Sequence, residues 1–362
     1  MTVVEAISVS KILDAMGDDA LEVEVVTKNG YGRSSFPARG EAINMAKEAV
    51  SRLIGKDANQ QAEIDRFLRA TFSDSNLNAV FSIAIAKAAA SSYDIPLCSY
   101  LGGAFSKAMP YPILRIFKTN VDYYVIVVGA KSVGNAVAIS TYIHREFNKL
   151  EMSRRSEDSH VLNNLTTIVE EAGTKFRIDV RLGVGFKSAA NFGGQYFLRE
   201  PGASTSTNEV DHMLELISRY NLYYVEDPFD KEDFRSFADL TEQAGNTCII
   251  CGDAIFNMDK DHILRGGKIG AANVIAINPA RTITEIYEIV EFAKQCGYDC
   301  VFSTEGSTTC ESAFSHVAVA LSVPFIKLSI SGAESTSKLN ELIRIEQEIL
   351  EGSDCKMMKK PI

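Results

Sequence analysis

Glu226 and Asp227 are carboxylates placed where an apolar run ends, a position at which side chains can do chemistry. Residues 222–225 read Leu-Tyr-Tyr-Val and lead directly into this acidic pair. Strands of a parallel sheet are buried on both faces and carry their polar residues where they end. An acidic pair at such an edge is typical of a metal ligand or an acid/base group in an α/β barrel. The competing interpretation is an exposed loop whose acids only cap the next helix.

Asp253 and Lys327 occupy comparable positions, since Asp253 follows the run 247–252 and Lys327 follows 324–326. Glu226 and Asp253 would come from adjacent strands and together could hold Mg²⁺, which takes few protein carboxylates in octahedral oxygen geometry. Buried lysines shift their pKa readily and suit a base or an anion ligand. The alternatives are that Asp253 caps its own loop and that Lys327 is ion-paired inside the barrel.

The elements that would position these residues alternate along the chain from residue 109 onward. The expected strands are 111–117, 122–128, 178–184, 222–226, 247–252, 272–277, 299–303 and 325–330. The expected helices are 131–149, 159–172, 208–219, 231–243, 259–265, 281–296, 311–321 and 337–351. Six consecutive βα units after a ββαα start predict a TIM-type (β/α) barrel with parallel strands, formed by residues 109–362.

The first 108 residues show a different pattern, with strands first and helices afterwards. The expected elements are strands 3–13 and 21–28, a third short strand ending near Phe36, and helices 40–55, 59–71 and 76–93. Asn29-Gly30 between the second and third strands is a hairpin signal. The sequence therefore predicts an α/β protein in which an N-terminal α+β domain, residues 1–108, precedes a ββαα(βα)₆ barrel.

Composition limits the class of function. The chain has 362 residues, 46% of them hydrophobic and 23% charged, which is typical of a globular protein. Its formal net charge of −10 and pI near 5.2 argue against a nucleic-acid or anionic-membrane binder, because phosphate binding needs a basic surface. The start, Met1-Thr2-Val3-Val4-Glu5, lacks the features of a signal peptide, so a cytoplasmic location is expected.

The cysteines and histidines give no sign of a catalytic or metal site. Cys248 and Cys251 form a CxxC among the seven cysteines, but on a strand their odd offset points them to opposite faces. Buried free thiols are the expectation for them. All five histidines fall on expected helices or at their starts, and none is expected to be catalytic.

Several segments resemble segments of enolase (phosphopyruvate hydratase), most of all of its archaeal members, and they follow one another in the same order along the chain. They are Leu21–Gly32, Asn76–Gly103, Val127–Lys131, Tyr224–Phe234, Cys251–Phe256, Ala272–Asn273 and Leu342–Glu348. The resemblance implies an N-terminal capping domain on a ββαα(βα)₆ barrel, in a homodimer or a larger assembly. It also implies Mg²⁺-dependent dehydration of 2-phosphoglycerate to phosphoenolpyruvate. In the family reaction, a lysine of the enzyme removes the α-proton of the substrate, metal ions stabilise the resulting enolate, and a glutamate assists departure of hydroxide.

Carried over residue by residue, the enolase site is only partly present. Glu226 and Asp253 match two of the family's three carboxylate metal ligands, and Lys327 matches its second active-site lysine. The resemblance therefore implies metal binding at Glu226 and Asp253 and a catalytic role for Lys327. The third metal ligand falls at Gly185, and Asn278 stands where the family has its catalytic-base lysine.

Other substrate-binding parts of the family pattern are also absent. The His-Arg-Ser phosphate motif is replaced by Thr304-Glu305-Gly306, and Met16 stands where the family has an arginine. Three loops are missing or shortened: the lid at 37–40, one between Arg115 and Asp122, and the glutamate-bearing loop between Asn148 and Asn163.

These losses lead to the hypothesis of an enolase paralogue without appreciable hydratase activity, acting as a scaffold or regulatory protein. A true enolase is then a candidate partner. The alternative is a metal-dependent lyase of altered substrate that uses Glu226, Asp253 and Lys327, joined by Lys187 and Glu305. An enolase with residual activity is the third reading.

Overall fold

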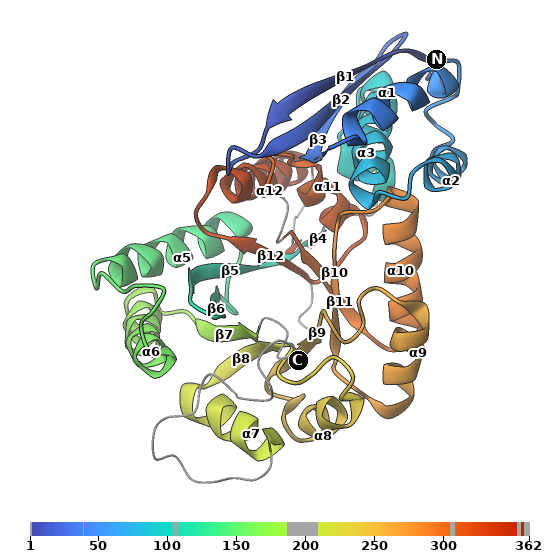
Figure 1. Ribbon diagram of the computed structural model, residues 1–362. Coiled ribbons are helices and arrows are strands. Elements are labelled where there is room, and N and C mark those ends of the chain that lie inside the picture. Colours follow the sequence, from blue (N-terminus) through green and yellow to red (C-terminus); the bar gives the residue numbers. More distant parts are fainter. Residues whose placement is uncertain are drawn as a thin grey trace.

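A barrel with surrounding helices occupies most of the computed structural model, which describes residues 2–38, 40–103, 108–186, 209–304, 308–352 and 356–357. Its strands are β5 (Tyr111–Lys118), β6 (Val121–Ile126), β7 (Arg181–Phe186), β8 (Leu222–Glu226), β9 (Ile249–Gly252), β10 (Val274–Ile277), β11 (Asp299–Ser303) and β12 (Phe325–Ser329). The helices are α5 (Val133–Asn148), α6 (Asp158–Phe176), α7 (Glu209–Tyr220), α8 (Phe234–Ala244), α9 (Lys260–Ile269), α10 (Ile283–Gln295), α11 (Ala313–Ala320) and α12 (Ala333–Gly352). The barrel closes in the order β10-β11-β12-β5-β6-β7-β8-β9, with the helices outside it (Figure 1).

The predicted fold class and the order ββαα(βα)₆ are confirmed, with element ends displaced by a few residues. The barrel is not wholly parallel, however, because β6 runs antiparallel to both β5 and β7. Only Thr119 and Asn120 separate β5 from β6, and so short a connection can join only antiparallel strands. The start of β6 therefore lies at the same end of the barrel as the ends of the other strands.

The N-terminal region is a three-stranded antiparallel sheet packed on helices. It consists of β1 (Val4–Leu13), β2 (Asp19–Thr27), β3 (Tyr31–Pro37), α1 (Ala42–Leu53), α2 (Gln61–Thr71), α3 (Ser75–Ser92) and α4 (Leu97–Gly102). Helix α3 is buried on nearly all sides and carries small residues because β3 approaches it closely. A Cβ on Gly32 would lie 2.0 Å from the carbonyl oxygen of Ala84, so only glycine fits there. A short pair, β4 (Ala108–Met109) with β13 (Lys356–Met357), was not predicted.

Two polar clusters attach this region to the barrel, beside α10, α11 and α12 (Figure 1). In the first, the buried carboxylate of Asp65 accepts hydrogen bonds from the amide of Thr284, at 2.9 Å, and from its hydroxyl, at 2.6 Å. In the second, Glu311 accepts from the ammonium of Lys87 at 2.5 Å and from the amide of Ser35 at 3.3 Å. The division at residue 108 stays a prediction, since these contacts join the two sides.

The CxxC cysteines lie in the core and the histidines lie on helices, as the sequence predicts. Cys248 and Cys251 are buried free thiols, as expected, and burial raises the pKa of both. The five histidines lie on α5, α6, α7, α9 and α11, away from the ends of the strands. Within the described ranges, no helix has the length and apolar character needed to cross a membrane. The cytoplasmic location stays a prediction.

We expect Glu311→Gln to lower the free energy of unfolding by about 3 kcal/mol, because it leaves a largely buried ammonium without its charged partner. Burial alone would raise the pKa of Glu311, but the charge and hydrogen bond of Lys87 more than offset it and hold that pKa below its usual value. The stabilisation should therefore be present near neutral pH and fade as the pH falls below about 4. Urea denaturation at pH 7 and at about pH 3 measures both effects.

The matched control is Glu63→Gln, which removes a carboxylate from an exposed ion pair with Lys56 at 3.6 Å. Exposed pairs contribute roughly 0–1 kcal/mol, so this variant should stay close to the parent protein. Equal losses in the two variants would contradict the role given to Glu311.

Candidate active site at the barrel mouth

Lys327 and Glu226 meet inside the barrel at the end where most strands finish. Lys327 lies on β12 and Glu226 is the last residue of β8, on the far side of the closed strand order. The ammonium Nζ of Lys327 donates to both carboxylate oxygens of Glu226, each at 2.6 Å. The two side chains are 0% and 8% exposed. Of the two interpretations of Lys327, the structure therefore shows the second, a lysine that is ion-paired inside the barrel.

Two tyrosines surround this ion pair. The hydroxyl of Tyr224, on β8, donates to the Oε2 atom of Glu226. Burial, together with the neighbouring Cys251 and Glu226, raises the pKa of Tyr224 well above its usual value, so the hydroxyl keeps its proton. Tyr124, on β6, packs edge-on against Tyr224 with ring centroids 5.8 Å apart, and its own centroid lies 5.9 Å from the Lys327 ammonium. Neither tyrosine was singled out from the sequence as a site residue.

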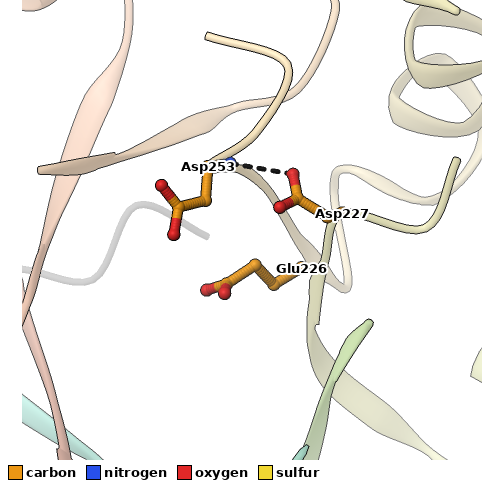
Figure 2. Close-up of side chains that lie close together, drawn as sticks. All are labelled: Glu226, Asp227 and Asp253. Atoms are coloured by element: carbon orange, nitrogen blue, oxygen red, sulfur yellow. Dashed lines mark hydrogen bonds between the residues drawn. The ribbon is translucent and has the colours of Figure 1, made fainter. Parts of the chain in front are cut away.

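Asp227 holds the loop that carries Asp253. It leaves β8 with a left-handed φ of 47°. Its carboxylate accepts hydrogen bonds from the amides of Asp253, at 2.9 Å, and Ala254, at 3.0 Å. Figure 2 shows the first of these bonds, with the carboxylates of Glu226 and Asp253 on the same side of the loop. Burial, and then the charges of Glu226 and Asp253, raise the pKa of Asp227 to about 8.

Among the residues that the structure describes, Glu226, Asp227 and Asp253 come nearest to a metal site. Each offers a carboxylate oxygen, and these oxygens lie within 4.8 Å of one another. The structure thus brings together Glu226 and Asp253, the predicted metal ligands. The donor set nevertheless fits Mg²⁺ poorly, because Glu226 already accepts from Lys327 and Tyr224, and Asp227 from backbone amides. Magnesium demands near-ideal octahedral geometry from oxygens that are free to bind it.

The place expected for the third metal ligand is filled by a ring. A Cβ built on Gly185 would lie 3.0 Å from Cε2 and 3.2 Å from the hydroxyl oxygen of Tyr124. Gly185 lies within β7, beside Glu226 in the barrel. A carboxylate side chain at position 185 would therefore require Tyr124 to move.

Asn278, expected at the position of the family's base lysine, is hydrogen-bonded within its own turn. Its side-chain Oδ1 accepts a hydrogen bond from the amide of Ala280 at 2.9 Å, and the residue is exposed. Thr304 donates through its amide and its hydroxyl to the backbone carbonyl of Lys327, at 3.2 and 3.1 Å. Lys187 and Glu305, named with the alternative function, lie outside the described residues.

Arg115 and Asp122 form a further polar pair that the sequence analysis missed. Asp122 pairs with Gly185 across β6 and β7, which places it at the mouth. Its Oδ1 atom lies 3.5 Å from Nη1 of Arg115, and the Asp122 side chain is buried while the Arg115 side chain is 23% exposed. Site residues of such barrels are expected at the ends of strands, whereas Asp122 lies at the start of β6. The available signal was the link of four residues between the expected strands 111–117 and 122–128, which is too short for a parallel crossover and so makes the second strand antiparallel, with its first residues at this edge.

Comparison with known proteins agrees with this architecture. The family described as enolase, C-terminal TIM barrel domain, matches residues 153–359. The chain belongs to the enolase family. It is 31% identical to the enolase of Methanothermobacter thermautotrophicus over 404 residues, covering 96% of this chain and 97% of the relative. The enolases of Halobacterium salinarum and Natronomonas pharaonis are 31% and 32% identical, each over 96% of this chain, with 100% and 99% of the relative covered.

We expect Gly185→Asp to lower the free energy of unfolding by about 2 to 4 kcal/mol, because it overpacks the barrel and buries a carboxylate. Tyr124→Ala should also destabilise the protein by a few kcal/mol through the cavity it leaves. The double variant should lose less than the sum of the two single variants, by at least about 1 kcal/mol, because each change relieves the other. Urea denaturation of all four proteins gives this coupling.

Phe237→Ala is the control for the cycle, since Phe237 is buried and packs against Phe229. Combined with Gly185→Asp, it should be additive. Additive losses for Tyr124→Ala as well would show that its ring does not restrict position 185.

Proposed function

We propose that this enolase-family protein has no appreciable 2-phosphoglycerate dehydratase activity. The observation that carries the proposal is the close approach of the Tyr124 ring to Gly185, which stands at the position expected for the third metal-binding carboxylate, so that a side chain there would require the ring to shift. Enolase chemistry places negative charge on an enolate in the transition state, and metal ions stabilise that charge in the family. A centre without the third ligand loses this differential stabilisation.

The position of the family's base supports the same proposal. Asparagine at 278 cannot abstract a proton, and its side chain is bonded into its own turn. Lys327, the remaining lysine of the pattern, has its ammonium on the carboxylate of Glu226. Loss of a general base typically costs on the order of 10² to 10⁴ in rate, and here it coincides with the altered metal centre.

The short connections are a third line of support. Thr119 and Asn120 alone join β5 to β6, and residues 149–157 join α5 to α6. The alignment with the enolase of Methanothermobacter thermautotrophicus spans 404 residues against the 362 of this chain, so the relative carries segments that this chain lacks. Loops that close over a substrate exclude water and complete the catalytic constellation, and shorter loops weaken both functions.

A protein with this fold and this centre is suited to a scaffold or regulatory role. We propose a homodimer or higher homo-oligomer, with a catalytically competent enolase as a second candidate partner. The cytoplasmic location expected from the sequence belongs to the same proposal.

The second candidate is a metal-dependent lyase that acts on an altered substrate. The observation in its favour is the grouping of Glu226, Asp227 and Asp253, whose oxygens lie within 4.8 Å of one another. In that case Lys327 would be the catalytic base or anion ligand and Glu226 and Asp253 would hold the cation. The chemistry supplied by Mg²⁺ would be stabilisation of an enolate-like charge.

We expect purified protein to give no phosphoenolpyruvate from 2-phosphoglycerate above the blank, in a coupled assay with millimolar Mg²⁺. The enolase of Methanothermobacter thermautotrophicus serves as positive control, and Asp253→Asn corrects for contaminating host enolase. Turnover that disappears in Asp253→Asn would overturn the proposal and make the chain an enolase with an unusual site. Turnover that is equal in both proteins belongs to the contaminant and supports the proposal.

The partner proposal predicts a mass of at least twice 39.6 kDa for the purified chain in light scattering coupled to gel filtration. Mixing with a catalytically competent enolase before the column tests the second partner, since subunit exchange would give a hetero-oligomer by native mass spectrometry. A monomer that does not exchange would contradict both assemblies.

A further inference from the structure

We propose that the Lys327 ammonium is a built-in counter-ion that takes the place of a divalent cation at the mouth of the barrel. The inference deepens the proposed function and rests on it, because it explains how this centre stays neutralised without a metal. Its basis is geometric and lies in the bonds around Glu226.

The carboxylate of Glu226 is almost fully used by protein donors. Two hydrogen bonds of 2.6 Å come from Lys327, and a third comes from the hydroxyl of Tyr224. A carboxylate has about four lone-pair sites, so little capacity remains for a metal. Charge-assisted bonds of this length are the strong ones, and the ammonium reaches both oxygens at once.

Binding of a second cation to the Glu226 carboxylate would cost free energy. Mg²⁺ bonds to oxygen at about 2.1 Å, so on Glu226 it would lie within about 5 Å of the Lys327 ammonium. Repulsion between the two positive charges is strong in a buried setting, where little water screens it. Moving the ammonium away would leave it without its partner in a side chain that is 0% exposed.

The surroundings hold the ammonium where it is. The ring centroid of Tyr124 lies 5.9 Å from Nζ, a cation–π distance. The backbone of Lys327 is fixed by its pairing with Ile113 on one side and Ser303 on the other, and by Thr304 bonded to its carbonyl. Tyr124 also occupies the space beside Gly185, so the same ring that blocks the third ligand packs against the counter-ion.

Isothermal titration calorimetry with Mn²⁺ and Mg²⁺ is the first test, using the full chain without chelator. Mn²⁺ is chosen because it takes the same oxygen ligands and usually binds them more tightly. The parent protein should show no saturable binding that depends on Glu226, and its melting temperature should not rise with either cation. Saturable binding that Glu226→Gln abolishes would overturn the inference.

Lys327→Met is the second test, since it removes the ammonium and keeps much of the apolar stem. Its melting temperature without cation should fall by roughly 10 °C, because Glu226 is left buried without its counter-ion. Added Mn²⁺ should recover part of the loss and bind saturably to this variant, whereas the parent protein shows no such binding. An unchanged melting temperature would overturn the inference.

The double variant Glu226→Gln/Lys327→Met tests the counter-ion role even if Lys327→Met alone does not fold. Removing both charges should restore stability relative to Lys327→Met and abolish the response to Mn²⁺. A double variant that is no more stable than Lys327→Met would contradict the counter-ion role. Tyr287→Phe, on an exposed side chain of α10, is the control for effects of substitution alone.

The outcomes separate this inference from the proposed function. Cation binding at Glu226 without any turnover of 2-phosphoglycerate would overturn the counter-ion and leave the proposed function intact. Turnover without such binding would overturn the proposed function and leave the counter-ion in place.

Discussion

The bond between Lys327 and Glu226 is the interaction on which the centre of this barrel depends. It joins β12 to β8 across the interior, with both side chains largely removed from solvent. Two charges in such a place stabilise the fold little relative to an apolar pair, but either one alone is strongly destabilising. The strands that carry them must therefore keep their register, since a shift of one residue would turn either side chain out of the interior.

Packing around this pair explains why β7 carries two glycines. A Cβ on Gly183 would lie 2.9 Å from Cβ of Tyr224, and a Cβ on Gly185 would lie 3.0 Å from the Tyr124 ring. The Tyr124 ring and the Cβ and backbone oxygen of Tyr224 thus lie where side chains of β7 would otherwise be. Barrel interiors are packed to nearly crystalline density, so a large residue on one strand requires a small one on its neighbour. The missing carboxylate at 185 and the aromatic residue at 124 are two sides of one packing arrangement.

Much of this architecture could be predicted from the sequence, because strand and helix periodicity is local. The alternation from residue 109 onward and the chemistry at Glu226, Asp253 and Lys327 follow from apolar runs and the residues that end them. The direction of β6 also follows from the sequence, because the expected strands 111–117 and 122–128 leave only four residues between them. The pairing of Lys327 with Glu226 was not derivable, since the two residues are 101 positions apart and only closure of the barrel brings them together. The alternative of an ion pair could be stated, but its partner could not be named.

The contacts of Tyr124 lay beyond sequence reasoning for a similar reason. In the sequence it is one aromatic residue in an apolar strand, and a structural role is the default for such a residue. Only the folded barrel brings its ring against Gly185, the position expected for the third metal ligand. The loss of a site residue can be read from a sequence by comparison with a family, whereas what fills the vacated space depends on neighbours from other strands.

These contacts change how the remaining family residues should be interpreted. Glu226 and Lys327 are what an enolase-like site would retain, and their presence taken alone favours catalysis. In this barrel each is also the other's partner in a buried pair, so loss of either one would destabilise the fold whether or not any reaction occurs. Their presence is therefore equally expected of an active and an inactive protein. Positions 185 and 278 bear more directly on function, because there the resemblance to enolase implies a metal-binding carboxylate and a base lysine, and this chain has glycine and asparagine.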